Sequence, residues 1–170
     1  QARFPRHNLL EAPVHNDMHA GNVKFDDEGD VVSLLDYDFM QTDLRVVEIN
    51  NMLMGKSDMD KPIPYNYDKF LALAQAYYEA LDAKLTDEEL QAMVEVVRLR
   101  FLEDMWSRFI RKFRVPLNVF EYPSKQYLAW ADVEVFKRFA EDFSSEEKVQ
   151  QFIAQVKNPG KGKGIDEDTS

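Results

Sequence analysis

The chain has 170 residues, of which 45% are hydrophobic and 31% charged, and it contains no cysteine. This length and balance are typical of one globular domain, and the lack of cysteine excludes disulfides and thiolate chemistry. The net charge of −10 argues against a nucleic-acid-binding surface, and no apolar run approaches the roughly 20 residues of a membrane-spanning helix. We therefore expect a cytoplasmic protein with no nucleic-acid or membrane partner.

The first 40 residues are turn-rich and contain short β-prone runs. Residues 12–15 are a short apolar segment typical of a strand. Residues 23–25 and 31–35 flank an acidic, glycine-containing turn at residues 26–30, and this pattern predicts a β-hairpin.

Helical patterns dominate residues 44–157. Apolar residues recur at helical spacing over residues 67–81. Thr86 and Glu89 have the spacing of a capping box, and the long apolar stripe that follows them ends at Pro116.

Two more helices are predicted near the C-terminus. One covers about residues 124–143, and the other begins at Ser144 or Ser145 and ends near residue 158. We interpret the aromatic side chains of all these helices, and Trp106, as core packing rather than a ligand cage. The glycine-rich and acidic residues 158–170 are expected to be a disordered tail after a single domain of residues 1–157.

The stretch His-Asn-Asp-Met-His-Ala-Gly-Asn at residues 15–22 carries the chemistry. Phosphoryl transfer needs a magnesium ion with oxygen ligands and a carboxylate that faces the acceptor hydroxyl. A hairpin brings its two ends together, so Asn22 at its start and Asp36 after its end should meet, with Asp17 just before them. The local pattern therefore predicts a metal–carboxylate site.

This loop, together with Leu-Leu-Asp-Tyr-Asp at residues 34–38, resembles the catalytic segment of the aminoglycoside phosphotransferase and choline kinase family. That segment reads His-Gly-Asp-Leu-His-x-Gly-Asn, followed by a strand that ends in an acidic–aromatic–acidic triplet. The match covers about residues 12–50. It implies an α+β, predominantly α-helical fold: a protein-kinase-like C-terminal lobe with a catalytic loop and hairpin at residues 12–40 and a helical part at residues 44–157.

The resemblance also implies roles for individual residues. Asp17 aligns with the catalytic Asp that orients and deprotonates the acceptor hydroxyl, and Asn22 and Asp36 align with the magnesium ligands. His15 aligns with a histidine that mainly holds the loop in shape, and Asp38 with a second acidic position. We assign these last two residues to the cofactor-binding group.

Four positions depart from the family pattern, among them Met18, where the family has Leu, and Ala20, where it often has Pro. Asn16 stands where the family usually has Gly, and Asn can replace Gly at a position that needs a positive φ. Glu48, which is one methylene longer, stands where the family has an Asp that ties down the catalytic loop.

The function that the resemblance implies is ATP- and Mg²⁺-dependent transfer of the γ-phosphate to a hydroxyl of a small, amine-bearing molecule such as homoserine, an aminoglycoside or choline. The net negative charge also favours an amine-bearing acceptor. The family has an N-terminal lobe that covers the nucleotide, and none of the six glycines forms a phosphate-binding loop before residue 15. We therefore expect this chain alone to be a poor catalyst that needs the N-terminal lobe of its parent protein as a partner.

Two alternatives remain open at this level. The chain could be a non-catalytic binding module built on a kinase-like lobe. It could also be a metallohydrolase that binds zinc through His15, Asp17, His19 and Asp36.

Overall fold

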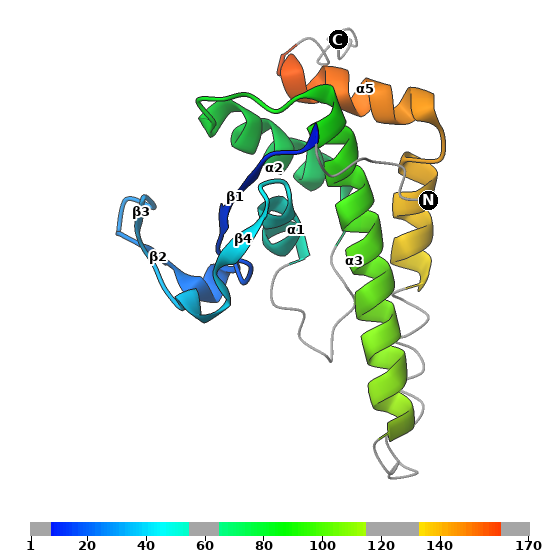
Figure 1. Ribbon diagram of the computed structural model, residues 1–170, viewed down its shortest axis with the longest axis horizontal. Coiled ribbons are helices and arrows are strands. Elements are labelled where there is room, and N and C mark those ends of the chain that lie inside the picture. Colours follow the sequence, from blue (N-terminus) through cyan, green and yellow to red (C-terminus); the bar gives the residue numbers. More distant parts are fainter. Residues whose placement is uncertain (1–7, 55–64, 115–132, 161–170) are drawn as a thin grey trace, which may run out of the picture.

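The computed structural model describes residues 8–54, 65–114 and 133–160. The fold is α+β and mostly helical, with two small antiparallel sheets (Figure 1). Within the described part of the chain, no helix combines the length and the apolar character needed to cross a membrane. The predicted start of a helix near residue 124, and the tail from residue 161 onward, lie outside the described residues.

The first sheet joins β1 (Glu11–Val14) to β4 (Gln41–Leu44), with Glu11 opposite Leu44 and Val14 opposite Gln41. The predicted strand at residues 12–15 is therefore confirmed within one residue. β4 was not predicted, because its first three residues are polar and show no apolar alternation. Its pairing brings the segment just before the loop at residues 15–22 beside the segment just before the main helices.

The second sheet is the predicted hairpin, formed by β2 (Val23–Phe25) and β3 (Val31–Leu34). Val23 lies opposite Leu34, and the register shifts between Lys24 and Phe25. The hairpin stands away from the helices at the left of Figure 1.

The turn of the hairpin is held by one carboxylate and one glycine. The side chain of Asp26 accepts hydrogen bonds from the backbone N–H groups of Glu28 at 3.1 Å and Asp30 at 2.8 Å. Gly29 has a φ of 90°, which other residues rarely adopt. Asp and Gly at these positions therefore explain why the chain reverses here.

The helical part contains five described helices. Their bounds are α1 (Val47–Met54), α2 (Tyr67–Ala80), α3 (Asp87–Arg114), a helix at residues 133–142 and α5 (Glu146–Lys157). The predictions of α2, α3 and α5 are confirmed, and the described end of the helix before α5 agrees with its prediction. In the capping box of α3, the Thr86 N–H donates to the Glu89 carboxylate at 2.9 Å, and the Glu89 N–H donates to the Thr86 hydroxyl at 3.2 Å. α1 packs against both α2 and α3.

Aromatic rings fill the centre of the helical part. Phe70 of α2 stacks on Phe152 of α5 with ring centroids 5.0 Å apart, and Phe139 lies 5.3 Å from Phe101 of α3. All four side chains are fully buried, as the core interpretation predicted. Trp106 is an exception: it is 62% exposed, so its assignment to the core was wrong.

Candidate functional site

His15 begins the loop between β1 and β2 and connects it to the end of β3. Its ring Nε2 lies 2.8 Å from the carbonyl oxygen of Leu35. A carbonyl oxygen can only accept, so Nε2 carries the proton and Nδ1 is the acceptor for the Asp17 N–H at 3.4 Å. His15 is only 5% exposed and both ring nitrogens are engaged, so it is placed to brace the loop rather than to contact a cofactor.

Glu48, in the first turn of α1, holds the same loop from the other side. One of its carboxylate oxygens accepts from the backbone N–H of His15 at 2.6 Å and from that of Asn16 at 3.3 Å. The side chain is buried, at 8% exposure. Glu48 thus holds the loop at residues 15–22, although it is longer than the Asp that the resemblance implies at this position.

Two residues of the site have a backbone conformation that is unusual for side chains other than Gly. Asn16 has a φ of 64° and Asp36 a φ of 63°, and no other non-glycine residue in the described ranges has a positive φ. Asn16 thus adopts the positive φ at which Asn can replace the Gly of the family pattern. Strained backbone tends to gather at functional sites, where surrounding contacts maintain it.

Asp17 and Asn22 are in direct contact through their side chains. The amide nitrogen of Asn22 donates to the Asp17 backbone carbonyl at 2.9 Å and to its carboxylate at 3.2 Å. The backbone carbonyl of Asn22 accepts from the N–H of Leu35 at 2.9 Å, so the next residue, Asp36, follows directly on this pairing. The loop and the hairpin therefore bring the backbone of Asn22 beside Leu35, the residue just before Asp36.

The two acidic residues after β3 face solvent. Asp36 and Asp38 are both exposed, and Asp38 belongs to the short helix η3 (Tyr37–Phe39). Within the described part of the chain, no hydrogen bond joins Asp38 to Asp17 or Asn22. Asp38 is thus near the site in sequence, but the structure does not link it to the other site residues.

His19, whose role the sequence left undecided, supports the loop. Its Nδ1 accepts from the N–H of Gly21 at 3.0 Å, and its Nε2 lies 3.6 Å from the Asp17 carboxylate. A Cβ at position 21 would meet the His19 ring at 2.9 Å, so any residue other than Gly there would force the ring to shift. His19 therefore packs over the turn and faces Asp17.

The loop and the hairpin end offer oxygen donors, which are the ligands that magnesium prefers. Over residues 8–54, 65–114 and 133–160, no three His, Asp or Glu side chains gather closely enough to hold a metal ion. Both ring nitrogens of His15 are occupied, which removes one ligand of the zinc alternative. What the site offers is the amide oxygen of Asn22 and the exposed carboxylate of Asp36, and magnesium needs only one or two carboxylates besides waters and phosphate oxygens.

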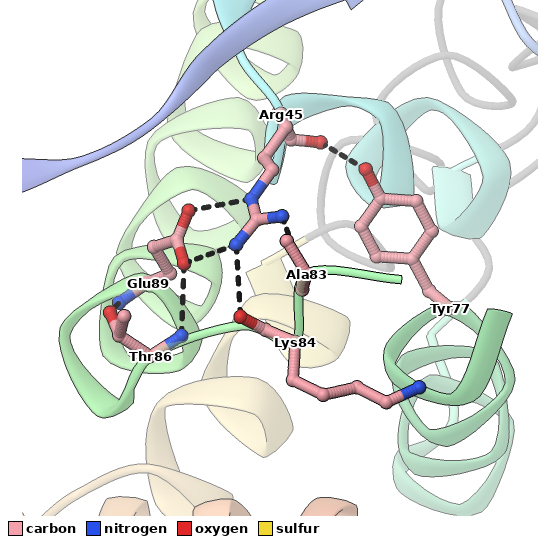
Figure 2. A network of polar contacts seen from close by, with 6 residues as sticks. All are labelled: Arg45, Tyr77, Ala83, Lys84, Thr86 and Glu89. Atoms are coloured by element: carbon pink, nitrogen blue, oxygen red, sulfur yellow. Dashed lines mark hydrogen bonds and ion pairs between the residues drawn. The ribbon is translucent and has the colours of Figure 1, made fainter. Parts of the chain in front are cut away.

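A buried ion pair behind the site was not predicted from the sequence. Arg45 donates through Nε and Nη2 to the two carboxylate oxygens of Glu89, at 2.7 and 2.6 Å (Figure 2). Burial alone would raise the pKa of Glu89, but the hydrogen bonds from Arg45 and from the Thr86 backbone outweigh burial and lower it. The sequence carried a signal, because Arg45 lies in an otherwise apolar run and a buried Arg needs an acidic partner.

Comparison of the chain with protein-family models, with curated proteins and with solved structures found no match. The resemblance of residues 12–50 to the phosphotransferase family therefore stays a prediction.

Proposed function

We propose that this chain is the C-terminal lobe of an ATP- and magnesium-dependent phosphotransferase with a protein-kinase-like fold. It would transfer the γ-phosphate to a hydroxyl of a small molecule, and the net charge of −10 favours an acceptor that carries an amine. Homoserine, an aminoglycoside and choline are the candidates. A second lobe of the parent protein would cover the nucleotide.

The observation that carries the proposal is the contact of Asn22 with both Asp17 and the end of the hairpin. The amide nitrogen of Asn22 is committed to Asp17. Its amide oxygen is thus left for another partner, and no described residue donates a hydrogen bond to it. A carboxylate, an oriented amide oxygen and a second carboxylate after the strand are the groups that phosphoryl transfer uses.

Each residue of the proposed site would have a separate role. Asp17, whose side chain is 34% exposed, would accept a hydrogen bond from the acceptor hydroxyl, orient it and take its proton. Asn22 and Asp36 would hold Mg²⁺, which when bound neutralises charge on the phosphate oxygens. His15 and Glu48 would keep the backbone around Asp17 in one geometry, because small displacements of a catalytic group reduce the rate strongly.

A metal titration followed by NMR tests the site in the chain itself. Mn²⁺ accepts the same oxygen ligands as Mg²⁺ and broadens the signals of nearby nuclei. With ATP present, we expect Mn²⁺ to broaden the side-chain amide signal of Asn22 far more than that of Asn66, which caps α2 on another part of the molecule. Asp36→Asn should abolish the selective broadening.

Asp82→Asn is the matched control, since Asp82 is an exposed acid in the loop between α2 and α3 and the change removes the same charge. Selective broadening should survive in this variant. Broadening that is equal at Asn22 and Asn66, or that persists in Asp36→Asn, contradicts the proposal.

Activity provides the second test. The purified chain should turn over ATP slowly with every acceptor, and a protein that includes the second lobe should be active. In that longer protein, Asp17→Ala should abolish transfer while nucleotide binding persists. Loss of nucleotide binding with an intact fold would give Asp17 a different role.

A further inference from the structure

Almost every polar atom of Arg45 makes a hydrogen bond, although Arg45 lies outside the site. Its guanidinium donates to both oxygens of Glu89 and also to the carbonyls of Ala83 at 2.7 Å and Lys84 at 3.2 Å. These bonds use four of its five N–H donors. Its backbone carbonyl accepts from the Tyr77 hydroxyl at 2.7 Å (Figure 2).

The backbone of Arg45 also extends the β1–β4 pairing. Its N–H donates to the carbonyl of Leu10 at 3.1 Å, one position beyond the pair of Glu11 with Leu44. Arg45 therefore connects four elements: the sheet on one side, α2 through Tyr77, and the loop and first turn of α3 through its guanidinium. We call Arg45, Glu89 and Tyr77 the clasp.

Two short paths lead from the clasp to the catalytic loop. Arg45 precedes α1 by two residues, and the first turn of α1 carries Glu48, whose carboxylate holds the backbone N–H groups of His15 and Asn16. On the other path, Leu10 leads through β1 directly to His15. Both paths reach the loop immediately before Asp17.

We propose that the clasp is a remote positioning device for the catalytic loop. By fixing Arg45, the clasp sets the positions at which α1 and β1 start. It thereby keeps the Glu48 carboxylate within hydrogen-bonding distance of the His15 N–H. Within the described ranges, no hydrogen bond or ion pair joins the clasp to Asp17 or to the proposed metal ligands, so the residues of the clasp are positioning residues and not catalytic ones. The inference rests on the proposed function only in its description of the loop as catalytic.

A buried ion pair can also act only on global stability, so the test must separate the two roles. Amide hydrogen exchange does this, because it reports local opening at single N–H groups. In Glu89→Gln, which retains an oxygen to accept from the Thr86 N–H, we expect the N–H groups of His15 and Asn16 to exchange about tenfold faster than global destabilisation alone explains. Core amides in α5 should follow global stability only.

Phe139→Leu is the matched control, because Phe139 is fully buried and none of its ring neighbours among the described residues belongs to the clasp. It should lower global stability without a selective effect at His15 and Asn16. Glu48→Ala is the positive control, because it removes the acceptor of both N–H groups directly. Equal acceleration at the loop and at core amides in Glu89→Gln overturns the inference.

Should Glu89→Gln fail to fold, Tyr77→Phe takes its place under the same criterion. This change removes only the hydroxyl that donates to the Arg45 carbonyl. The exchange measurements contain no metal and no nucleotide, so their result is independent of the Mn²⁺ titration. Failure of selective broadening at Asn22 would contradict the proposed function, whereas failure of selective exchange at His15 would contradict the clasp.

Discussion

The side-chain amide of Asn22 donates to two oxygens of one residue, the backbone carbonyl and the carboxylate of Asp17. Both partners are acceptors, so the orientation of the amide is fixed: nitrogen toward Asp17 and oxygen away from it. Asn22 is buried at 7% exposure, so water does not readily replace these bonds. The contact therefore fixes how the amide oxygen of Asn22 is oriented relative to the carboxylate of Asp17.

Removal of this amide should destabilise the protein. In Asn22→Ala, we expect the free energy of unfolding to fall by about 1–3 kcal/mol, because the part-buried carbonyl of Asp17 loses its donor. Urea denaturation measures the change. Asn158→Ala is the control, since Asn158 donates to Ala154 at an exposed helix end and should change stability by only about 0.5 kcal/mol or less. Equal losses in the two variants would contradict the importance of the Asn22 contacts.

The backbone at Asn16 predicts an order of stability between two variants. Asn16→Gly and Asn16→Ala both remove the side-chain amide, so their difference isolates the cost of the positive φ. We expect the Gly variant to be more stable than the Ala variant by about 1–2 kcal/mol, because a left-handed conformation is unfavourable for residues with a Cβ. Thermal or urea denaturation of the two proteins gives this difference. Equal stability of the Ala and Gly variants would mean that residue 16 does not keep a positive φ in solution.

The ion pair of Arg45 with Glu89 predicts that the free energy of unfolding depends on pH in the acid range. The folded-state pKa of Glu89 is lowered, so the stability that the pair contributes is present above the ordinary carboxyl pKa of about 4.3 and is lost as pH falls below it. At pH 7, Glu89→Gln should lower the free energy of unfolding by about 3–5 kcal/mol, since it leaves a buried Arg45 without its counter-ion.

The difference between wild type and Glu89→Gln should shrink as the pH falls toward about 3. Urea denaturation at a series of pH values measures it. A gap that stays the same from neutral to acid pH would contradict a charged pair.

The raised pKa of Tyr65 predicts that the free energy of unfolding depends on pH in the alkaline range. Burial raises the pKa of its hydroxyl above the usual value, and the hydrogen bond to Asp142 at 2.7 Å raises it further. A raised folded-state pKa means that this contribution to stability is complete below about pH 10 and is lost as the pH rises above it. The fall in unfolding free energy above pH 10 should be shallower in Tyr65→Phe than in the wild type. Parallel curves would contradict the prediction.

Much of the fold follows from local sequence signals. The Asp- and Gly-containing turn predicted the β2–β3 hairpin, and the Thr86–Glu89 spacing predicted the start of α3. β4 could not be predicted in the same way, because its polar residues form a strand only through pairing with β1, about 30 residues earlier. Such long-range pairing leaves little trace in local propensity.

The candidate site, like the fold, could be predicted from the sequence only in part. The hairpin predicted that the chain around Asn22 and Asp36 would meet, since closing a turn brings its ends together. The left-handed conformation of Asp36 was not expected, because Asp rarely adopts it and no glycine marked the position. The partner of Arg45 was also hidden, since 44 positions separate it from Glu89.

The nesting of the two sheets has a consequence for how the chain folds. β2 and β3 lie within residues 15–40, the segment that must close when β1 meets β4. A hairpin formed early shortens that segment, and each halving of a flexible loop lowers its closure entropy cost by about 0.6 kcal/mol. We therefore expect the acidic turn at residues 26–30 to affect the folding rate: a turn that forms slowly delays the pairing of β1 with β4, and that pairing closes the segment that contains residues 15–22.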